Sequence, residues 1–472
     1  MSRRYDLVIV GMGSGGLVAA DFAATLGLRV AAVEAHRIGG DCLWTGCVPS
    51  KALLASAKIA HHMRRAAEYG IRPVEPDVDL EAVWARIRSI QDAIATTDDS
   101  PEHLEAKGVE LVHGAATIVS AHEVEVGGRR LDTRFILIAT GSRPAVPDID
   151  GLAEAGYLTS ETLFELERPP ASLVVVGGGP IGVELAQGCR RLGLPVTLLQ
   201  RGARLLPRDE PELTKRVPDI LRREGVEVQL DADLQRVRVE DGSLVVHARL
   251  GKAERTFRAG GILVAAGRTP NVDALGLAQL GIEVGPSGIV TDARSRTSVA
   301  SIYAVGDVTG RQLFTHAAAN QAAAAVRDMF FPGAGRPSAL VPWCTFTDPE
   351  LASVGLTAGA AAAQHGAGVT RTWTRELRDS DRARADGATD GAIVLVTAEE
   401  KLVGAHVLAP AAGEMIQELA LAIDQGLKLR DLASLVHVYP TVATGIQQLA
   451  GEAGYERARR FGWLVRRETR RG

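Results

Sequence analysis

The chain has 472 residues, more than one hydrophobic core usually organises, so we expect about three domains of roughly 100 to 200 residues each. Apolar residues make up 46% and charged residues 23%, which excludes a collagen-like or largely disordered chain. The net charge of -4 gives no reason to expect a nucleic-acid partner, and four cysteines are too few for a secreted disulfide framework. We therefore expect a cytoplasmic protein.

The first predicted unit lies near the N-terminus. Glycines interrupt the apolar run there, and no apolar stretch of about 18 residues occurs, so neither export nor a membrane span is predicted. A β-branched strand at residues 5–10 leads into Gly11-x-Gly13-x-x-Gly16 at the start of an Ala-rich helix, and Glu34 ends the next strand. Such a turn lets backbone N–H groups approach a pyrophosphate while the carboxylate accepts from an adenosine ribose. We interpret it as a dinucleotide site; the alternative is a tight structural turn.

Two cysteines follow in the segment Cys42-Leu-Trp-Thr-Gly-Cys47, which leads into a helical pattern near Ser50. Their spacing allows a small disulfide, and a helix N-terminus favours thiolate over thiol. A half metal site is the alternative, but no further His or Cys pair has the spacing to complete a tetrahedral set, so no metal is predicted. Cys189 and Cys344 are interpreted as core residues.

The pattern of strand, glycine turn and helix recurs at residues 172–200, after helical stretches at 50–70 and 80–108 and sheet-like alternation at 109–138. This second turn is Gly177-x-Gly179-x-x-Gly182, and its second strand ends in Gln200-Arg201 where NAD sites usually carry an acid. Arg201 could neutralise a 2′-phosphate, with Arg204 or Arg208 nearby. NADPH is therefore favoured, with NADH possible. The alternative is that these arginines are ordinary solvated charges.

The remaining chain closes both folds and adds a third domain. Residues 226–265 have strand character, a strand is expected at 301–305, and 332–337 reads as a linker. The third domain mixes strands at 393–397 and 402–408 with helices at 413–426 and 443–460.

The order of these motifs resembles the class I pyridine nucleotide-disulfide oxidoreductases, the relatives of lipoamide dehydrogenase, glutathione reductase and mercuric reductase. The resemblance rests on Gly39 to Lys51 between the two glycine turns and covers nearly the whole chain. It implies an α/β fold with two Rossmann-like domains, for FAD and NAD(P)H, and a C-terminal α+β dimerisation domain. The predicted boundaries are 1–148 and 268–338 for the two parts of the FAD domain, 149–267 for the NAD(P)H domain and 339–472 for the dimerisation domain.

The resemblance also implies roles for single residues. Cys47 would face the flavin and Cys42 would meet the acceptor, while Lys51 and Glu184 would form an ion pair at the flavin edge. The further FAD contacts and cofactor-binding residues assigned in this way are Thr140, Gly141, Arg268, Asp307 and His316.

Two departures bear on function. Pro180 stands where many relatives have a tyrosine that shields the flavin. In His437-Val-Tyr-Pro-Thr-Val-Ala-Thr444, Tyr439 replaces the family's catalytic histidine and Thr444 the glutamate that orients it, while His437 lies two residues upstream. Mercuric reductases also carry a tyrosine here, but this chain lacks their terminal cysteine pair.

We therefore predict a homodimer with an active site built from both subunits, in which electrons pass from NADPH through FAD and the Cys42–Cys47 disulfide to a small acceptor. A soft metal ion, a quinone or an activated disulfide would fit. The alternatives are a lipoamide or glutathione-type reductase with Tyr439 or His437 in proton transfer, and a non-catalytic flavin redox sensor. The Arg-rich tail after Phe461 is either solvated or in contact with an acidic surface or lipid headgroups.

Overall fold

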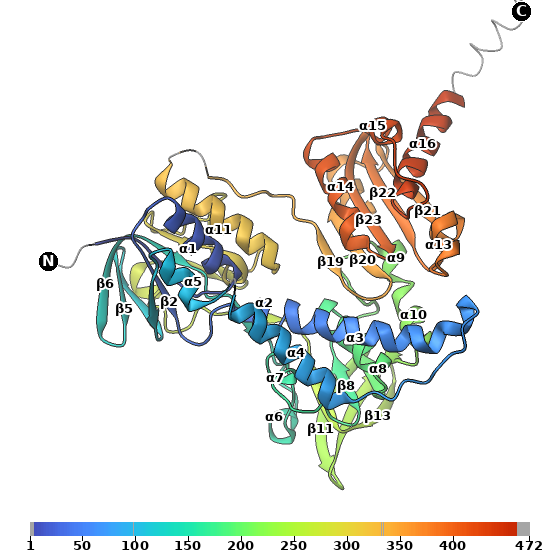
Figure 1. Cartoon of the computed structure of the whole chain (residues 1–472), viewed down its shortest axis with the longest axis horizontal. Helices are drawn as coiled ribbons and strands as arrows, with labels where there is room; N and C mark the ends of the chain where they lie inside the picture. Colours follow the sequence, from blue (N-terminus) through green and yellow to red (C-terminus); the bar gives the residue numbers. More distant parts are fainter. Residues whose placement is uncertain (1–3, 98, 332, 334, 460–472) are drawn as a thin grey trace, which may run out of the picture.

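The computed structural model describes residues 4–459 apart from 98, 332 and 334, so the predicted Arg-rich tail lies outside the described residues. The chain forms three lobes, with the N-terminal lobe at the left of Figure 1, the middle of the chain below and the C-terminal lobe at the upper right. Helix α3 runs from the N-terminal lobe beneath the C-terminal lobe and joins the three (Figure 1).

The N-terminal lobe is built on a sheet whose strand order is β3-β2-β1-β6, with β18 paired to the far side of β6. These strands are parallel to one another, and Val10 of β1 lies between Val33 and Ile138 in register. Leu7, Val8 and Ile9 have no exposed surface, as expected for a strand covered on both faces. The parallel strands are β1 (Tyr5–Val10), β2 (Val30–Glu34), β3 (Glu110–His113), β6 (Arg129–Ile138) and β18 (Ile302–Ala304).

Helices α1 (Ser14–Thr25) and α11 (Thr315–Phe330) lie side by side in this lobe (Figure 1). The sheet also carries two antiparallel strands and is followed by two small ribbons, which close the turns around the site. These elements are β4 (Ala116–Ser120), β5 (Glu123–Val126), β7 (Ser142–Pro144) with β15 (Arg268–Pro270), β16 (Val284–Gly285) with β17 (Gly288–Ile289), η2 (Ala278–Leu280) and η3 (Gly306–Thr309).

The cysteine segment bridges the lobes. Helix α2 (Gly40–Trp44) is followed by α3 (Cys47–Arg65), which packs on α4 (Leu80–Ala95) and on α8 (Pro180–Arg191) of the next lobe. The buried residues of α3 include Leu53, Ala57 and Ala60, at the spacing of one helix face. The helices predicted at 50–70 and 80–108 are confirmed, with η1 (Ala66–Tyr69) and α5 (Pro101–Ala106) completing them.

The second lobe repeats the parallel arrangement with strand order β10-β9-β8-β14. An antiparallel sheet, β11-β12-β13, packs beside it and supplies part of a separate apolar cluster. The strands are β8 (Leu173–Val176), β9 (Val196–Leu199), β10 (Glu227–Gln229), β11 (Ala232–Glu240), β12 (Ser243–Leu250), β13 (Ala253–Ala259) and β14 (Gly261–Val264). The short helices are α6 (Leu152–Ala155), α7 (Ser160–Leu163), α9 (Pro211–Thr214) and α10 (Val217–Arg223).

The C-terminal lobe is an antiparallel sheet of order β19-β20-β23-β22-β21 with helices packed on it. Its strands are β19 (Trp343–Thr345), β20 (Glu350–Gly355), β21 (Thr370–Glu376), β22 (Ala392–Ala398) and β23 (Lys401–Ala409). Its helices are α12 (Ala358–His365), η4 (Leu377–Asp379), α13 (Asp381–Ala385), α14 (Ala412–Asp424), α15 (Leu429–Ser434) and α16 (Thr444–Arg459). The predicted α/β fold class, with two dinucleotide folds and a C-terminal α+β domain, is thus confirmed.

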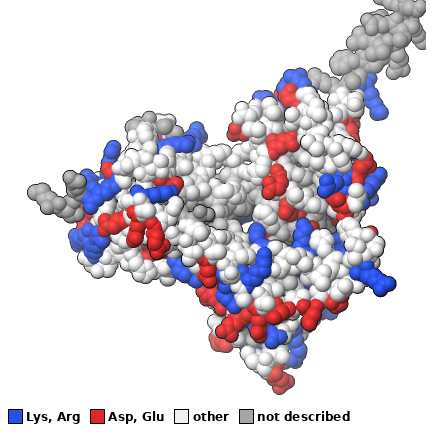
Figure 2. Space-filling model, in the orientation of Figure 1, with Lys and Arg blue, Asp and Glu red and all other residues white. Residues whose placement is uncertain are grey.

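The surface gives no sign of a single charged face in the view of Figure 2, where acidic and basic side chains are distributed over all three lobes. Within the described residues, no helix is both long and apolar enough to cross a membrane.

Candidate active site

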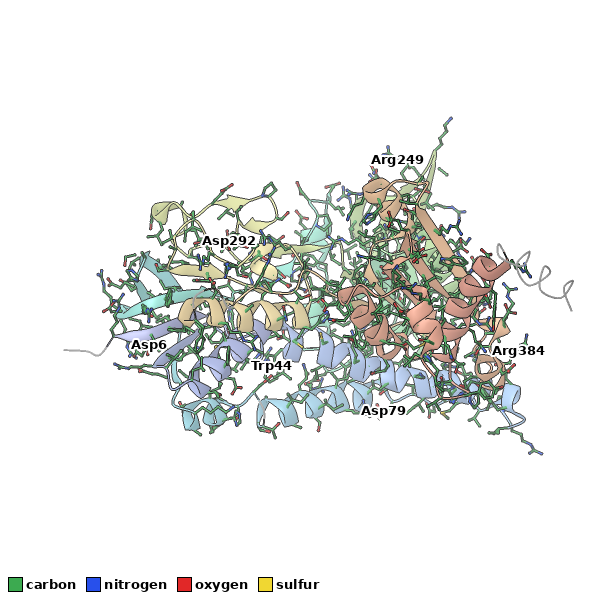
Figure 3. All side chains as sticks on the ribbon, turned by 90° about the horizontal axis from the view of Figure 1, so that it is seen from above. Asp6, Trp44, Asp79, Arg249, Asp292 and Arg384 are labelled. Carbon is green, nitrogen blue, oxygen red and sulfur yellow. The ribbon has the colours of Figure 1, made fainter. Side chains whose placement is uncertain are left out.

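A cavity of about 2480 Å³ contacts all three lobes and is lined by both glycine turns and both cysteines. Trp44, between the two cysteines, lies between the lobe of Asp6 and the lobe of Arg384 (Figure 3). The cavity therefore brings together the two predicted cofactor sites and the predicted dithiol.

The first glycine turn is closed tightly by its own backbone. Gly11 has φ +97°, and a Cβ there would lie 2.6 Å from the carbonyl oxygen of Ala139. A Cβ on Gly16 would lie 2.0 Å from the Gly11 oxygen, so both positions require glycine. Glu34 accepts from the N–H of Met12 at 2.7 Å and lines the cavity. Gly13, Thr140 and Gly141 line the same region of the cavity.

The second turn has the same construction with a different side chain at the strand end. Gly177 has φ +116°, and a Cβ on Gly182 would lie 1.9 Å from the Gly177 oxygen. A Cβ on Gly179 would meet nothing within 4 Å, so the backbone there borders open space. Gln200 accepts from the N–H of Gly178 at 2.9 Å, in the way that Glu34 accepts from Met12. A neutral amide thus takes the place of the acid.

The three arginines predicted near the second turn differ in where they point. Arg201 and Arg208 are exposed and line the cavity. Arg204 donates to the carbonyl oxygen of Pro207 at 2.6 Å and is not among the lining residues, so its predicted cofactor contact is not supported.

Cys42 lies in α2 and Cys47 is the first residue of α3, and both thiols are free. The Cys47 sulfur lies 3.3 Å from the hydroxyl of Thr315. A hydrogen bond from Cys42 lowers the pKa of Cys47 to about 6, helped by Thr315 and the charge of Lys51 and opposed by burial and Asp41. The hydrogen bond with Cys47, burial and the Cys47 charge raise the pKa of Cys42. Cys47 is therefore the thiolate of the pair.

Lys51 and Glu184 form the expected ion pair, with Nζ 2.9 Å from Oε2. The Glu184 side chain is 6% exposed, and its other oxygen accepts from the N–H of Phe346 at 2.9 Å. The ammonium lies 4.3 Å from the Phe346 ring centroid, which adds a cation–π contact. The positive charge is thereby held one helical turn from Cys47.

Arg268 joins three segments at the first cofactor site. It donates to the hydroxyl of Ser142 at 2.7 Å and lies 3.3 Å from Asp41 and 3.6 Å from Asp307. Burial raises the pKa of Asp307, while a hydrogen bond from Ser142 lowers it. His316, next in the chain to Thr315, donates through Nε2 to the carbonyl oxygen of Pro342 at 2.7 Å.

These residues fit a dinucleotide at each turn. Both turns have glycines whose Cβ positions are blocked by backbone, and each presents N–H groups at the start of a helix beside the cavity. Glu34 can accept from ribose hydroxyls at the first turn, which suits FAD, whereas Arg201 and Arg208 supply positive charge at the second.

Comparison with known proteins agrees with this geometry. Residues 5–323 match the family described as pyridine nucleotide-disulphide oxidoreductase, and residues 341–450 match its dimerisation domain. The chain belongs to the pyridine nucleotide-disulphide oxidoreductase family. It is similar to a mercuric reductase of Streptomyces lividans, at 37% identity over 94% of this chain and 95% of the relative. A dihydrolipoyl dehydrogenase of Halobacterium salinarum is 34% identical over 96% and 97%.

Among solved structures, the chain resembles the HOCl-induced flavoprotein disulfide reductase RclA from Escherichia coli, with a TM-score of 0.83 and 27% identity. The match covers 95% of this chain and 99% of RclA. A Cu(II) complex of RclA matches with a TM-score of 0.84 and 26% identity. The predicted membership of this flavoprotein disulfide reductase family is thus confirmed.

Residues 437–444 form the C-terminal loop, and none of them is among the residues that line the cavity. Tyr439 is 64% exposed and donates to Asp381 at 2.9 Å, and this hydrogen bond raises its pKa. The His437 side chain is 7% exposed, with Nε2 3.1 Å from both oxygens of Glu418. Thr444 donates to the carbonyl oxygen of Val438 at 2.9 Å. Both side chains are thus hydrogen-bonded within their own chain, but Tyr439 is exposed whereas the His437 side chain is nearly covered.

Several contacts escaped sequence reasoning. Asp41 lies within the cysteine segment but was given no role, and Asp381 and Glu418 belong to no motif; the partners Arg268, Tyr439 and His437 lie elsewhere in the chain. Cys189 is a buried core residue as predicted, whereas Cys344 packs against the C-terminal core cluster but is only partly buried and also lines the cavity. The signal that could have found Asp41 is its place directly before Cys42.

Proposed function

We propose that the protein is an FAD-dependent, NADPH-oxidising homodimer that passes electrons through the Cys42–Cys47 disulfide to a small acceptor. A soft metal ion, a quinone or an activated disulfide fits this role. The observation that carries the proposal is the meeting of Cys47, Thr315 and the Lys51–Glu184 pair in the cavity that both glycine turns line. A cytoplasmic location belongs to the same proposal.

The chain's own residues divide the work. FAD, when bound, supplies two-electron chemistry between nicotinamide and thiols. Reduction of the disulfide takes two electrons and one proton, which goes to Cys42, because Cys47 with a pKa of about 6 remains largely thiolate. The Lys51 ammonium stabilises negative charge beside Cys47. Transfer of two electrons to the acceptor restores the disulfide.

NADPH is the proposed donor because the second turn presents cations and no acid. Gln200 occupies the position of the usual carboxylate, and Arg201 and Arg208 face the cavity. An acid at this place would repel a 2′-phosphate, whereas guanidinium groups bind phosphate with charge-assisted hydrogen bonds.

The proposed acceptor takes electrons from the dithiol without a base that removes the thiol proton. Tyr439 stands in place of the family's histidine and is bonded to Asp381, which raises its pKa and keeps the phenol protonated. A protonated phenol is a poor base toward a thiol at neutral pH. The names mercuric reductase and Cu(II) complex, borne by similar proteins, support a soft metal ion among the candidate acceptors.

A screen of NADPH oxidation tests the proposal. The wild type is assayed with Hg²⁺, Cu²⁺, quinones, an activated aromatic disulfide, lipoamide and glutathione disulfide, beside Cys42→Ser and Cys47→Ser. We expect turnover with at least one metal ion, quinone or activated disulfide, and loss of that turnover in both variants. Fast turnover that survives both substitutions would contradict the dithiol route, and absence of turnover with every acceptor would favour a redox sensor.

A further inference from the structure

The loop between β9 and α9, residues 200–210, rests on the second glycine turn. The N–H of Leu206 donates to the carbonyl oxygen of Gly178 at 2.8 Å. The same loop carries Arg201 and Arg208, which line the cavity. A ligand bound by these arginines therefore contacts the loop directly.

Asp209, directly after Arg208, ties this loop to the C-terminal lobe. Its side chain is nearly buried, with the residue 3% exposed. One carboxylate oxygen accepts from the indole N–H of Trp343 at 2.7 Å and from the hydroxyl of Ser353 at 2.9 Å. Because an unpaired buried carboxylate is costly, these donors fix the position of the loop.

A row of aromatic rings continues from Trp343 to the dithiol. Trp343 lies nearly parallel to Phe314, with 6.3 Å between ring centroids, and Phe314 stacks on His316 at 5.5 Å. His316 donates back to Pro342, the neighbour of Trp343, at 2.7 Å. Thr315, inside this segment, contacts the Cys47 sulfur at 3.3 Å. Packed contacts thus run without a gap from the arginine loop to Cys47.

We infer that the Asp209–Trp343 hydrogen bond is a positioning contact that couples occupancy of the second cofactor site to the Phe314–His316 segment beside Cys47. The inference rests on the proposed function, which assigns the nicotinamide cofactor to the second turn. Trp343 acts through Phe314 and touches no reacting atom in this scheme. Thr315 of this segment contacts the Cys47 sulfur, so the segment links the nucleotide site to the dithiol. Because coupling between two sites is reciprocal, the redox state of the dithiol then changes the affinity for the nucleotide.

The test uses adenosine 2′,5′-bisphosphate and ADP-ribose, fragments that lack nicotinamide and cannot touch the flavin through it. FAD-loaded wild type and Trp343→Phe are titrated anaerobically by calorimetry, each in the oxidised and the two-electron-reduced state. The substitution keeps an aromatic ring against Phe314 and removes the indole N–H. Trp373→Phe is the matched control, since the Trp373 N–H donates to Thr397 at 3.4 Å in the same lobe, away from the cavity.

We expect the wild-type Kd of the bound fragment to differ at least about fivefold between the two redox states, the lower end of typical coupling. The ratio should fall toward one in Trp343→Phe and stay at the wild-type value in Trp373→Phe. If Trp343→Phe does not fold, Phe314→Leu breaks the same row and should also bring the ratio toward one.

A wild-type ratio of one, or an unchanged ratio in Trp343→Phe, would overturn the inference while leaving the cofactor site intact. Binding of neither fragment to the wild type would instead remove the proposed cofactor site together with the inference. The two failures are therefore distinguishable in one set of titrations.

Discussion

The cavity and the C-terminal loop follow the family pattern to different degrees. In the cavity, both glycine turns, the Cys42–Cys47 pair and the Lys51–Glu184 ion pair are present with the expected contacts. In the loop, Tyr439 is bonded to Asp381 and Thr444 to a backbone carbonyl. We therefore propose that electrons enter the dithiol as in the family, whereas their delivery to the acceptor differs.

We therefore expect two half-reactions to vary independently, namely reduction of the dithiol by the nicotinamide cofactor and transfer of electrons from the dithiol to the acceptor. Cys47, Lys51 and Glu184 line one cavity, and Glu184 also accepts a hydrogen bond from the N–H of Phe346. The loop that departs is largely exposed, and its side chains are held by single carboxylates. Tyr439 and Thr444 are not among the residues that line the cavity.

The largest expected effect comes from the thiolate. Cys47→Ser should abolish both turnover and the long-wavelength thiolate-to-flavin absorption band of the two-electron-reduced enzyme, because Cys47 carries the low pKa. Cys344→Ser is the matched control, since Cys344 also lines the cavity but burial raises its pKa. Retention of the band in Cys47→Ser with its loss in Cys42→Ser would reverse the assignment.

The next effect concerns the loop. Tyr439→His with Thr444→Glu should raise activity with dihydrolipoamide, because general acid-base catalysis is typically worth about 10² to 10⁴ in rate. Steady-state kcat/KM with dihydrolipoamide measures the change, and Tyr439→Phe serves as the control that removes the hydroxyl without adding a base. A double variant no faster than Tyr439→Phe would show that the loop does not reach the thiols.

A smaller effect is expected at the second glycine turn. A charge-assisted hydrogen bond of about 1.5 to 3 kcal/mol corresponds to a preference for NADPH over NADH of about 10- to 150-fold. Arg201→Ala should erase much of this ratio of kcat/KM values, whereas Arg204→Ala should not, because Arg204 is turned toward Pro207. Equal use of both cofactors by the wild type would contradict the proposed role of Arg201.

The smallest expected effect concerns the pH at which the thiolate-to-flavin absorption band is lost. Because the Cys42 hydrogen bond lowers the pKa of Cys47 to about 6, the thiolate and its band should persist at neutral pH and fade as the pH drops through about 6. Lys51→Met should move the midpoint upward, since the Lys51 charge favours the thiolate. A midpoint near the ordinary cysteine value of about 8.5 would contradict this account.

The sequence predicts those features that a few neighbouring residues specify. A glycine turn with its following helix, or two cysteines at a helix start, is specified within a few residues, and Gly11 and Cys47 were found in this way. Contacts between distant segments carry no such local signal. Tyr439 and Asp381 are 58 residues apart and Trp343 and Asp209 134 apart, so only the folded chain shows that they meet.

The same reason applies to the arginines near the second glycine turn, whose cofactor contacts stay a prediction. The sequence favours Arg201, with Arg204 or Arg208 nearby, but does not show where these side chains point. Their directions depend on the path of the loop, which turns Arg204 onto the Pro207 carbonyl and leaves the other two toward the cavity. The domain boundaries drawn from the sequence stay a prediction.

Stopped flow can measure the two half-reactions separately and so test whether the departure in the C-terminal loop slows delivery of electrons without slowing their entry. The wild type is first mixed anaerobically with NADPH, and the reduced enzyme is then mixed with lipoamide, glutathione disulfide or a metal ion such as Hg²⁺ or Cu²⁺. We predict rapid reduction of the flavin and disulfide, slow reoxidation by lipoamide and glutathione disulfide, and faster reoxidation by acceptors that need no proton relay. Reoxidation by lipoamide at roughly a hundred per second or more, within the upper range of ordinary enzyme turnover, would show that this loop supplies a competent base and would contradict the account.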